Sequence, residues 1–257
     1  MPSPPPAVAV DLDGVLWRAS EPIPGSATAV RRLQEAGVDV VFVTNNAGPT
    51  VAEHEAKLAR FDVDAAGAVI TSPMAAALLL QPGERVLCAG GPGLTEAVLG
   101  AGSQPFTYEE ADGAEVDAIV VGYHRDFDYD RMRIASAAVR AGARFVATND
   151  DSTYPTETGV IPGNGAIVAG IATAAGVAPT IAGKPHQPIA DVVLARCGPV
   201  GLMVGDRMDT DGLFAATLGW DFGLVLSGVV TKADLPVEPE PAMVADDLAA
   251  LVDRLLG

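Results

Sequence analysis

The chain of 257 residues is long enough for one large domain or two smaller ones, and its 49% hydrophobic and 19% charged residues are typical of a globular protein. Its 16 basic residues against 33 acidic ones give a formal net charge of −17, which argues against nucleic acid and anionic lipid as partners. The two cysteines, Cys88 and Cys197, fit neither a disulfide framework nor a metal motif, and no apolar run reaches the roughly 20 residues that span a bilayer. The sequence therefore predicts a cytoplasmic protein without a membrane segment.

The first part of the chain alternates short apolar runs with helical patterns. An apolar strand over 7–10 is followed by a helix over 26–36 and a second apolar strand over 38–43. Gly37 supplies the helix stop between them. Parallel strands joined by helical crossovers produce this alternation, so the sequence predicts an α/β fold with a right-handed βαβ unit at its start.

Two further helix starts follow this unit. In "TVAE", Thr50 precedes Glu53 by three residues and forms a capping box, and in "TSPM" we expect Ser72 to cap a helix that has Pro73 in its first turn. His54 lies on the first of these helices, where we expect it to be solvated.

The rest of the chain continues in the same style. In the middle, the apolar runs "RVLCAGG", "VDAIVVGYH" and "RFVATNDD" predict strands, with a helix over 129–141 and a loop-rich stretch over 100–117, and together they indicate a second small α/β unit. After the helix "GAIVAGIATAAG", the strands "PTIAG", "GLMVG" and "FGLVLSG" follow, and "ADDLAALVDRLLG" closes the chain as an amphipathic helix.

Polar side chains follow four of the predicted strands. The strand over 7–10 is followed by Asp11 and Asp13, and "VVFV" is followed by Thr44. "PTIAG" leads to Lys184, and "GLMVG" to Asp206. Because ligands bind beyond the carboxyl ends of the strands in an open parallel sheet, we expect these residues to share one edge.

Acidic residues at one edge imply a cation. Two unit charges about 4 Å apart at an effective dielectric constant near 20 interact by roughly 4 kcal/mol, so Asp11 and Asp206 are neighbours only with a cation between them. A Mg²⁺ ion held by one or two carboxylates and a substrate phosphate suits such a sparse set of oxygen ligands.

The spacing of the first two carboxylates indicates phosphoryl transfer. Asp11 can attack phosphorus directly, because a carboxylate needs no base to activate it. Asp13, displaced along the turn, can protonate the leaving oxygen and later deprotonate water. Thr44 and Lys184 would then hold the phosphoryl oxygens, while Asp206 and Mg²⁺ neutralise the developing charge.

Lys184 is unusual in a chain with only three lysines, Lys57, Lys184 and Lys232, beside 13 arginines. A compact ammonium differs from the planar guanidinium fork that this chain otherwise uses. The scarcity of lysine therefore favours a specific role for Lys184.

Four motifs in order resemble the haloacid dehalogenase-like (HAD) phosphohydrolase superfamily: "DLDGVLW", "VTNN", "GKP" and "GDRMDTD". The stretches "TSPMAA", "PTETGVIPGNGAIVAGIATAAG" and "VLSGV" are similar to subfamily IIA, which contains 4-nitrophenylphosphatases and phosphoglycolate, glycerol-phosphate, pyridoxal and nucleotide phosphatases. The resemblance covers nearly the whole chain.

This resemblance implies a set of metal ligands. Asp11 would be both nucleophile and Mg²⁺ ligand, and Asp13 would bind Mg²⁺ through its backbone carbonyl. Asp206 would ligate the metal directly, and Asp211 would orient a metal-bound water. Thr44, Asn45 and Lys184 would contact the phosphate.

The resemblance also implies two domains. A Rossmann-like parallel-sheet core would comprise 1–81 and 180–257, and a large inserted type-2 α/β cap would comprise 82–179. Caps of this kind often mediate dimers, so a homodimer through the cap is expected.

These observations predict a Mg²⁺-dependent phosphatase that hydrolyses small phosphate monoesters of metabolites through an aspartyl-phosphate on Asp11. A phosphomutase or other phosphotransferase on the same core is an alternative, as is a non-catalytic receiver-like module that binds phosphate. Receivers, however, lack a catalytic acid two residues after the acceptor, and they lack a large cap.

Two histidines depart from the family pattern. His124 stands in a cap segment where relatives commonly differ, so the identity of the substrate is not determined by it, and His186 is expected at the surface.

Overall fold

The computed structural model describes residues 4–19, 21–156 and 159–257. The described chain forms two compact units. Unit 1 comprises Met1–Thr44, Ala52–Ile70 and Ala190–Gly257, and unit 2 comprises Asn45–Val51 and Thr71–Ile189. The predicted stretch "PTETGVIPGNG" includes positions 157 and 158, which lie outside the described residues.

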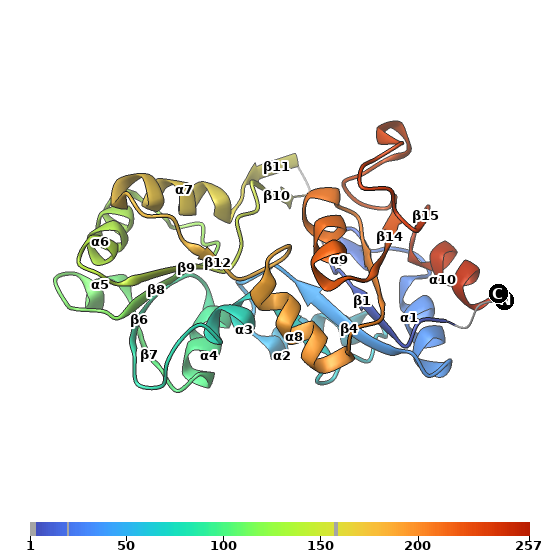
Figure 1. Cartoon of the computed structure of the whole chain (residues 1–257), viewed down its shortest axis with the longest axis horizontal. Coiled ribbons are helices and arrows are strands. Elements are labelled where there is room, and N and C mark those ends of the chain that lie inside the picture. The colour runs from blue at the N-terminus through green and yellow to red at the C-terminus, as the bar shows by residue number, and fades with distance from the viewer. Residues whose placement is uncertain (1–3, 20, 157–158) are drawn as a thin grey trace. The chain divides into compact units, whose positions relative to one another are not determined.

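Unit 1 is built on a six-stranded sheet with the strand order β15-β14-β13-β1-β4-β5 (Figure 1). The pairings from β15 through β4 are all parallel, as the alternation of strands and helices predicts. The strands are β1 (Ala7–Val10), β4 (Asp39–Thr44), β5 (Val69–Thr71), β13 (Leu202–Gly205), β14 (Asp221–Val225) and β15 (Met243–Ala245).

The central strand of this sheet is β1, which pairs with β13 on one side and β4 on the other. All four of its residues are buried. Because both faces of this strand are covered, its side chains are apolar in succession instead of alternating with polar ones. Val10 pairs with both Phe42 and Val204, so β1, β4 and β13 end at the same edge.

Helices cover this sheet, and a short hairpin follows β1. The helices that contribute to unit 1 are α1 (Ser26–Glu35), α2 (Val51–Arg60), α8 (Gln187–Cys197), α9 (Leu213–Leu218) and α10 (Leu248–Leu256). A π-helix spans Met208–Gly212, a 3₁₀ turn spans Lys232–Asp234, and β2 (Trp17–Arg18) and β3 (Glu21–Pro22) form the antiparallel hairpin.

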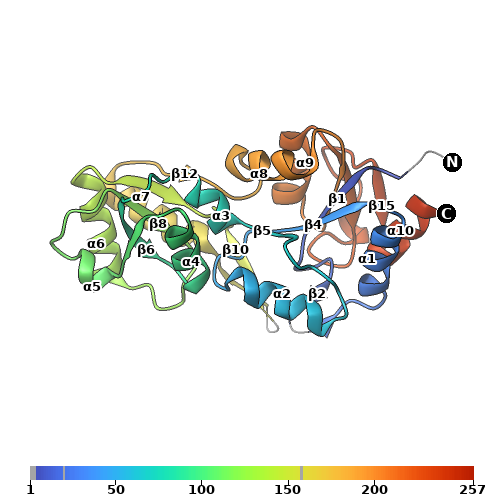
Figure 2. The same ribbon diagram turned by 90° about the horizontal axis from the view of Figure 1, so that it is seen from below.

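The closing helix α10 shows how sequence sets this packing. Asp247 accepts a hydrogen bond from the Ala250 N–H and caps the helix, as acidic residues at that position commonly do. Leu248, Leu251 and Val252 share the buried face, and α10 packs beside α1 (Figure 2). The predicted amphipathic helix is therefore confirmed.

Unit 2 contains a five-stranded parallel sheet with the order β12-β9-β8-β6-β7. Its strands are β6 (Arg85–Ala89), β7 (Gln104–Phe106), β8 (Ala118–Val121), β9 (Arg144–Ala147) and β12 (Thr180–Ile181). Its helices are α3 (Ser72–Ala77), α4 (Pro92–Gly100), α5 (Tyr108–Ala111), α6 (Tyr129–Arg140) and α7 (Asn164–Ala175), and β10 (Thr153–Thr156) pairs antiparallel with β11 (Gly159–Pro162). The helices α6 and α7 pack against each other over a core that includes Ile119, Phe145 and Ile171 (Figure 1).

Three local predictions were wrong. Thr71, rather than Ser72, caps α3, because the Thr71 hydroxyl accepts the hydrogen bond from the Met74 N–H. The stretch 100–117, predicted as loop-rich without helix or strand, also holds the short elements β7 and α5. His54 is buried with 3% exposure rather than solvated.

Among the described residues, none of the helices has both the length and the apolar character needed to cross a membrane.

Candidate active site

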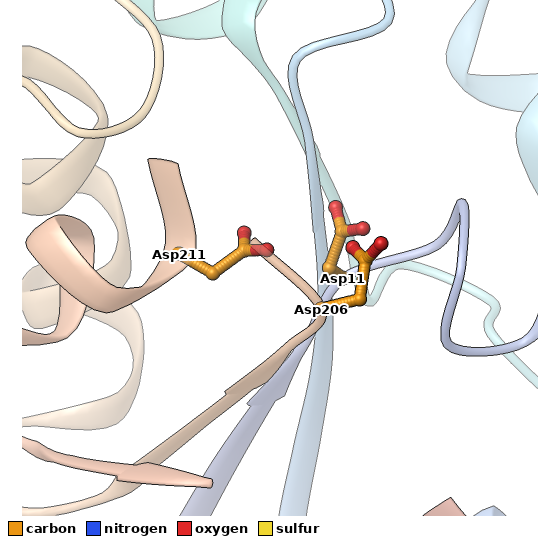
Figure 3. Close-up of side chains that lie close together, drawn as sticks. All are labelled: Asp11, Asp206 and Asp211. Atoms are coloured by element: carbon orange, nitrogen blue, oxygen red, sulfur yellow. The ribbon is translucent and has the colours of Figure 1, made fainter. Parts of the chain in front are cut away.

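Three carboxylates gather at the edge of the sheet in unit 1 (Figure 3). Asp11, Asp206 and Asp211 each offer a carboxylate oxygen, and these oxygens lie within 4.8 Å of one another. Asp11 is half-buried, whereas Asp206 and Asp211 are 2% and 1% exposed. We call these three side chains the carboxylate cluster.

Parallel pairing brings two members of the carboxylate cluster together. Asp11 follows β1 and Asp206 follows the adjacent β13, and the Asp11 N–H donates to the Val204 carbonyl at 2.9 Å. Asp211 comes from the π-helix that follows β13, which turns its carboxylate back toward the strand end. The Arg207 N–H donates to this carboxylate at 3.2 Å.

Asp206 is held between two glycines. A Cβ at Gly14 would lie 2.4 Å from Asp206 Oδ2, and a Cβ at Gly228 would lie 1.9 Å from the same atom. Gly14 also has a φ of +86°, which disfavours any other residue. The Val229 N–H donates to Asp206 Oδ2 at 2.6 Å, so the backbone fixes this carboxylate from several sides.

The carboxylate cluster fits a hard divalent cation. Three carboxylates this close would repel one another, and the burial of Asp206 and Asp211 limits the screening that water provides. Mg²⁺ takes oxygen ligands and is usually bound through one or two carboxylates together with water or phosphate. Asp11, Asp206 and Asp211 could therefore hold this ion together.

Asp13 lies outside the carboxylate cluster and has a different environment. Its Oδ1 accepts a hydrogen bond from the Trp17 indole Nε1 at 2.8 Å. The ligand atom predicted for Asp13 is its backbone carbonyl, so the side-chain cluster does not test that prediction. Thr44 ends β4, the strand beside β1, and is 2% exposed.

In unit 2, Lys184 is buried with 2% exposure, and Asn45 fixes its backbone. The Lys184 N–H donates to Asn45 Oδ1 at 2.8 Å, and Asn45 Nδ2 donates to the Lys184 carbonyl at 3.0 Å. The Asn45 carbonyl in turn accepts hydrogen bonds from Ser72 Oγ at 3.0 Å and Asn149 Nδ2 at 2.8 Å. The structure thus joins the predicted phosphate residues Asn45 and Lys184, although their motifs are far apart in sequence.

Trp17 and Asp151 contact predicted site residues and were not predicted from the sequence. Trp17 ends the motif "DLDGVLW", and its hydrogen bond to Asp13 spans only four residues. Asp151 is the last residue of the predicted strand "RFVATNDD" and lies beyond the end of the observed strand β9, and its Oδ1 accepts from Asn45 Nδ2 at 3.1 Å. The available signal was an acidic residue just beyond the apolar run 145–147, which is the criterion that singled out Asp11.

Two histidines have separate environments in unit 2. His124 Nε2 lies 3.1 Å from the Tyr108 hydroxyl and its Nδ1 lies 2.8 Å from the Gly122 carbonyl, and burial lowers the pKa of its imidazole. His186 is more exposed, as expected, with its Nε2 3.4 Å from Asp150 Oδ1.

Two family models match the chain. A haloacid dehalogenase-like hydrolase model matches residues 8–104, and a HAD-hydrolase-like model matches residues 181–251. The first match contains Asp11, Asp13 and Thr44, and the second contains Lys184, Asp206 and Asp211.

Curated proteins and solved structures that are named as phosphatases or as a nucleotidase are similar to most of the chain. D-glycerol 3-phosphate phosphatase from Mycobacterium tuberculosis is 38% identical over 94% of this chain and 69% of its own length. A 5'-nucleotidase from Bacillus subtilis is 33% identical over 93% of this chain and 94% of its own length. The structure of the glycerol phosphate phosphatase from Mycobacterium tuberculosis in complex with magnesium has a TM-score of 0.86 at 35% identity, covering 96% of this chain and 76% of that one.

These matches confirm the predictions of the α/β fold class, of a phosphatase and of Mg²⁺ as cofactor. The family models, the extended identity and the carboxylate cluster at the edge of the parallel sheet agree with one another. The chain belongs to the haloacid dehalogenase-like hydrolase family, and its relatives support subfamily IIA.

Proposed function

We propose that this enzyme hydrolyses small phosphate monoesters, with Asp11 as nucleophile and Asp13 as general acid and base. The observation that carries the proposal is the carboxylate cluster, because it combines an accessible carboxylate with two buried ones at the end of the central strands. Asp11 is the least buried of the three, as a residue that reacts with substrate must be.

The chemistry follows from the two carboxylates of the first motif. An Asp11 oxygen attacks phosphorus, the bond from phosphorus to the leaving oxygen breaks, and Asp13 gives that oxygen a proton. Asp13 then takes a proton from water, which attacks the aspartyl-phosphate and releases inorganic phosphate and free Asp11. Mg²⁺, when bound, supplies positive charge that offsets the charge on the phosphoryl oxygens.

We assign phosphate binding to Thr44, Asn45 and Lys184. Within the carboxylate cluster, Asp11 and Asp206 would contact the metal directly, and Asp211 would contribute through a water that it orients. The side-chain amide of Asn45 makes two hydrogen bonds to the Lys184 backbone, so its contact with phosphate is assigned to its backbone N–H. The burial of Lys184 supports a role for its ammonium in a site that excludes water.

A cysteine nucleophile is the main alternative for phosphate ester hydrolysis, and the structure disfavours it. Burial raises the pKa of the Cys88 thiol to about 12 and that of the Cys197 thiol to about 11. Both cysteines are free, and thiols with such pKa values hold almost no thiolate near neutral pH. Free thiols also support a cytoplasmic location.

The proposed substrate is a small phosphorylated metabolite. Relatives named for glycerol 3-phosphate and for nucleotides support this class, and the net charge of −17 opposes binding of a nucleic acid polymer. We keep the division into a core of 1–81 and 180–257 and a cap of 82–179 as part of the proposal, together with a homodimer through the cap.

Removal of the cation is the experiment that tests this function. Hydrolysis of 4-nitrophenyl phosphate, followed as release of inorganic phosphate, is expected to fall by at least about 100-fold when excess chelator is present, because charge stabilisation is lost. Excess Mg²⁺ is expected to restore it. Full activity in the chelator would show that the carboxylate cluster does not act through a metal.

Asp13→Asn is expected to impair substrates with poor leaving groups selectively. An amide cannot donate the proton that an alkoxide leaving group needs, whereas nitrophenolate departs without it. The measurement is kcat/KM for glycerol phosphate and for 4-nitrophenyl phosphate, because this ratio includes the departure of the leaving group. Equal losses on the two substrates would remove the acid role from Asp13.

A further inference from the structure

The indole of Trp17 makes a direct contact with the carboxylate of Asp13. Trp17 Nε1 donates to Asp13 Oδ1 at 2.8 Å, and the whole tryptophan is only 1% exposed. An indole has a single N–H and no acceptor, so this buried donor is fully committed to one oxygen of Asp13.

The backbone between the two residues also holds them together. The Gly14 N–H donates to the Trp17 carbonyl at 2.7 Å, and the Leu16 N–H donates to the Leu12 carbonyl at 2.9 Å. Asp13 and Trp17 form an isolated β-bridge. The turn after β1 thus closes on itself and places the indole against the carboxylate.

A cation lies over the face of the same indole. Lys57 Nζ is 3.8 Å from the centroid of the Trp17 ring and donates to the Ala19 carbonyl at 3.3 Å. Burial lowers the pKa of the Lys57 ammonium, and the nearby charge of Asp13 opposes that shift. The Phe61 ring packs against Trp17 with the two centroids 5.8 Å apart, which fixes the plane of the indole further.

We propose that Trp17 is a positioning residue for Asp13: its N–H holds Oδ1, so that the proton transferred to the leaving group is carried by Oδ2. The cation of Lys57 on the ring face strengthens this hydrogen bond, because it draws electron density from the indole and makes the N–H a better donor. This inference rests on the proposed role of Asp13 as general acid.

The Asp13 carboxylate needs such a hydrogen bond because it is otherwise free to rotate. A carboxylate on a turn can rotate about its terminal bond, and only some orientations aim the proton at the leaving oxygen. A hydrogen bond from a rigid, buried ring selects one orientation. Its loss would slow the proton transfer while leaving substrate binding largely intact.

The test is Trp17→Phe, which keeps an aromatic ring and removes the N–H. We expect kcat/KM for glycerol phosphate to fall by about 10-fold, the size of one hydrogen bond, and that for 4-nitrophenyl phosphate to change by less than about 3-fold. In an Asp13→Asn background, Trp17→Phe should add no selective loss, because no acid remains to be oriented. Equal losses on both substrates in the single variant would overturn the proposal.

Trp220 offers a matched control. It is also buried, with 7% exposure, but its Nε1 finds no hydrogen-bond partner within the described part of the chain. Trp220→Phe therefore removes an indole N–H without touching Asp13, and any loss of activity should be the same for both substrates. A larger loss on glycerol phosphate than on 4-nitrophenyl phosphate in this variant would show that the difference between the two substrates does not report on Asp13.

Lys57→Met keeps the selectivity test available if Trp17→Phe does not fold. It preserves most of the side-chain stem and removes the charge, and we expect a selective loss of about 3-fold on glycerol phosphate. Absence of that selectivity would overturn the part assigned to Lys57, and with an unfolded Trp17→Phe it would overturn the proposal as a whole. Failure of the wild-type protein to hydrolyse either substrate would instead contradict the proposed function.

Discussion

Asp11→Asn is expected to lower turnover by about 10⁴-fold or more, because an amide cannot accept the phosphoryl group as a carboxylate does. The substitution preserves the size of the side chain and removes one of three neighbouring negative charges, so the fold should persist. Turnover of 4-nitrophenyl phosphate and the thermal transition should be measured on the same preparation.

Covalent labelling gives this prediction a second measurement. After brief reaction with labelled phosphate ester and an acid quench, label should remain on the wild-type protein and be absent from Asp11→Asn. Asp209→Asn is a suitable control, since Asp209 lies on the same π-helix as Asp211 but its side chain is 64% exposed and pairs with Arg207. Wild-type turnover in Asp11→Asn would show that another residue is the nucleophile.

Lys184→Arg is expected to reduce turnover by about 100-fold, although it keeps the positive charge. The ammonium of Lys184 is buried, and Asn45 fixes its backbone by hydrogen bonds at both the N–H and the carbonyl. A guanidinium is larger and planar, so we expect that it cannot place its charge where the buried ammonium lies. Such overpacking can also cost about 1–3 kcal/mol of stability, so turnover must be measured well below the thermal transition.

Lys232→Arg is the matched control for this substitution. The side chain of Lys232 is 72% exposed and forms a surface ion pair with Asp246 at 2.8 Å, so the same chemical change there should leave turnover and stability unchanged within about 0.5 kcal/mol. If folded Lys184→Arg turned over like the wild type, the phosphate-binding role of Lys184 would be refuted.

The sequence predicted the central strands well and the edges of both sheets less well. β1 and β13 are short apolar runs that end in aspartate, and burial on both faces produces that pattern. β5, β7 and β15 have only three residues each, too few for a periodic signal to emerge. Their pairing depends on neighbouring strands that are distant in sequence.

The site, like the fold, was predictable from the sequence only in part. The positions of Asp11 and Asp206 were predictable because strand ends in a parallel sheet converge, a rule that requires no side-chain detail. The contact between Trp17 and Asp13 was not, because the conformation of the turn depends on Gly14 and the indole packs against Lys57 of α2 and Phe61 just after it. The burial of His54 was equally hidden, since one turn of helix gives no measure of what covers it.

The connectivity of unit 1 has a consequence for how the protein is made. Gly14 and Ser227, joined by a hydrogen bond of 2.7 Å, are 213 positions apart, and β1 has to wait for β13 to complete its pairing. At about 5–20 residues per second, a ribosome takes roughly 10 to 40 s to synthesise the intervening chain. During that interval the nascent chain carries Asp11, the proposed nucleophile, without Asp206 and Asp211. On the proposed mechanism, activity is therefore expected only after residue 211 has been synthesised, and a shorter chain is expected to be inactive toward phosphate esters.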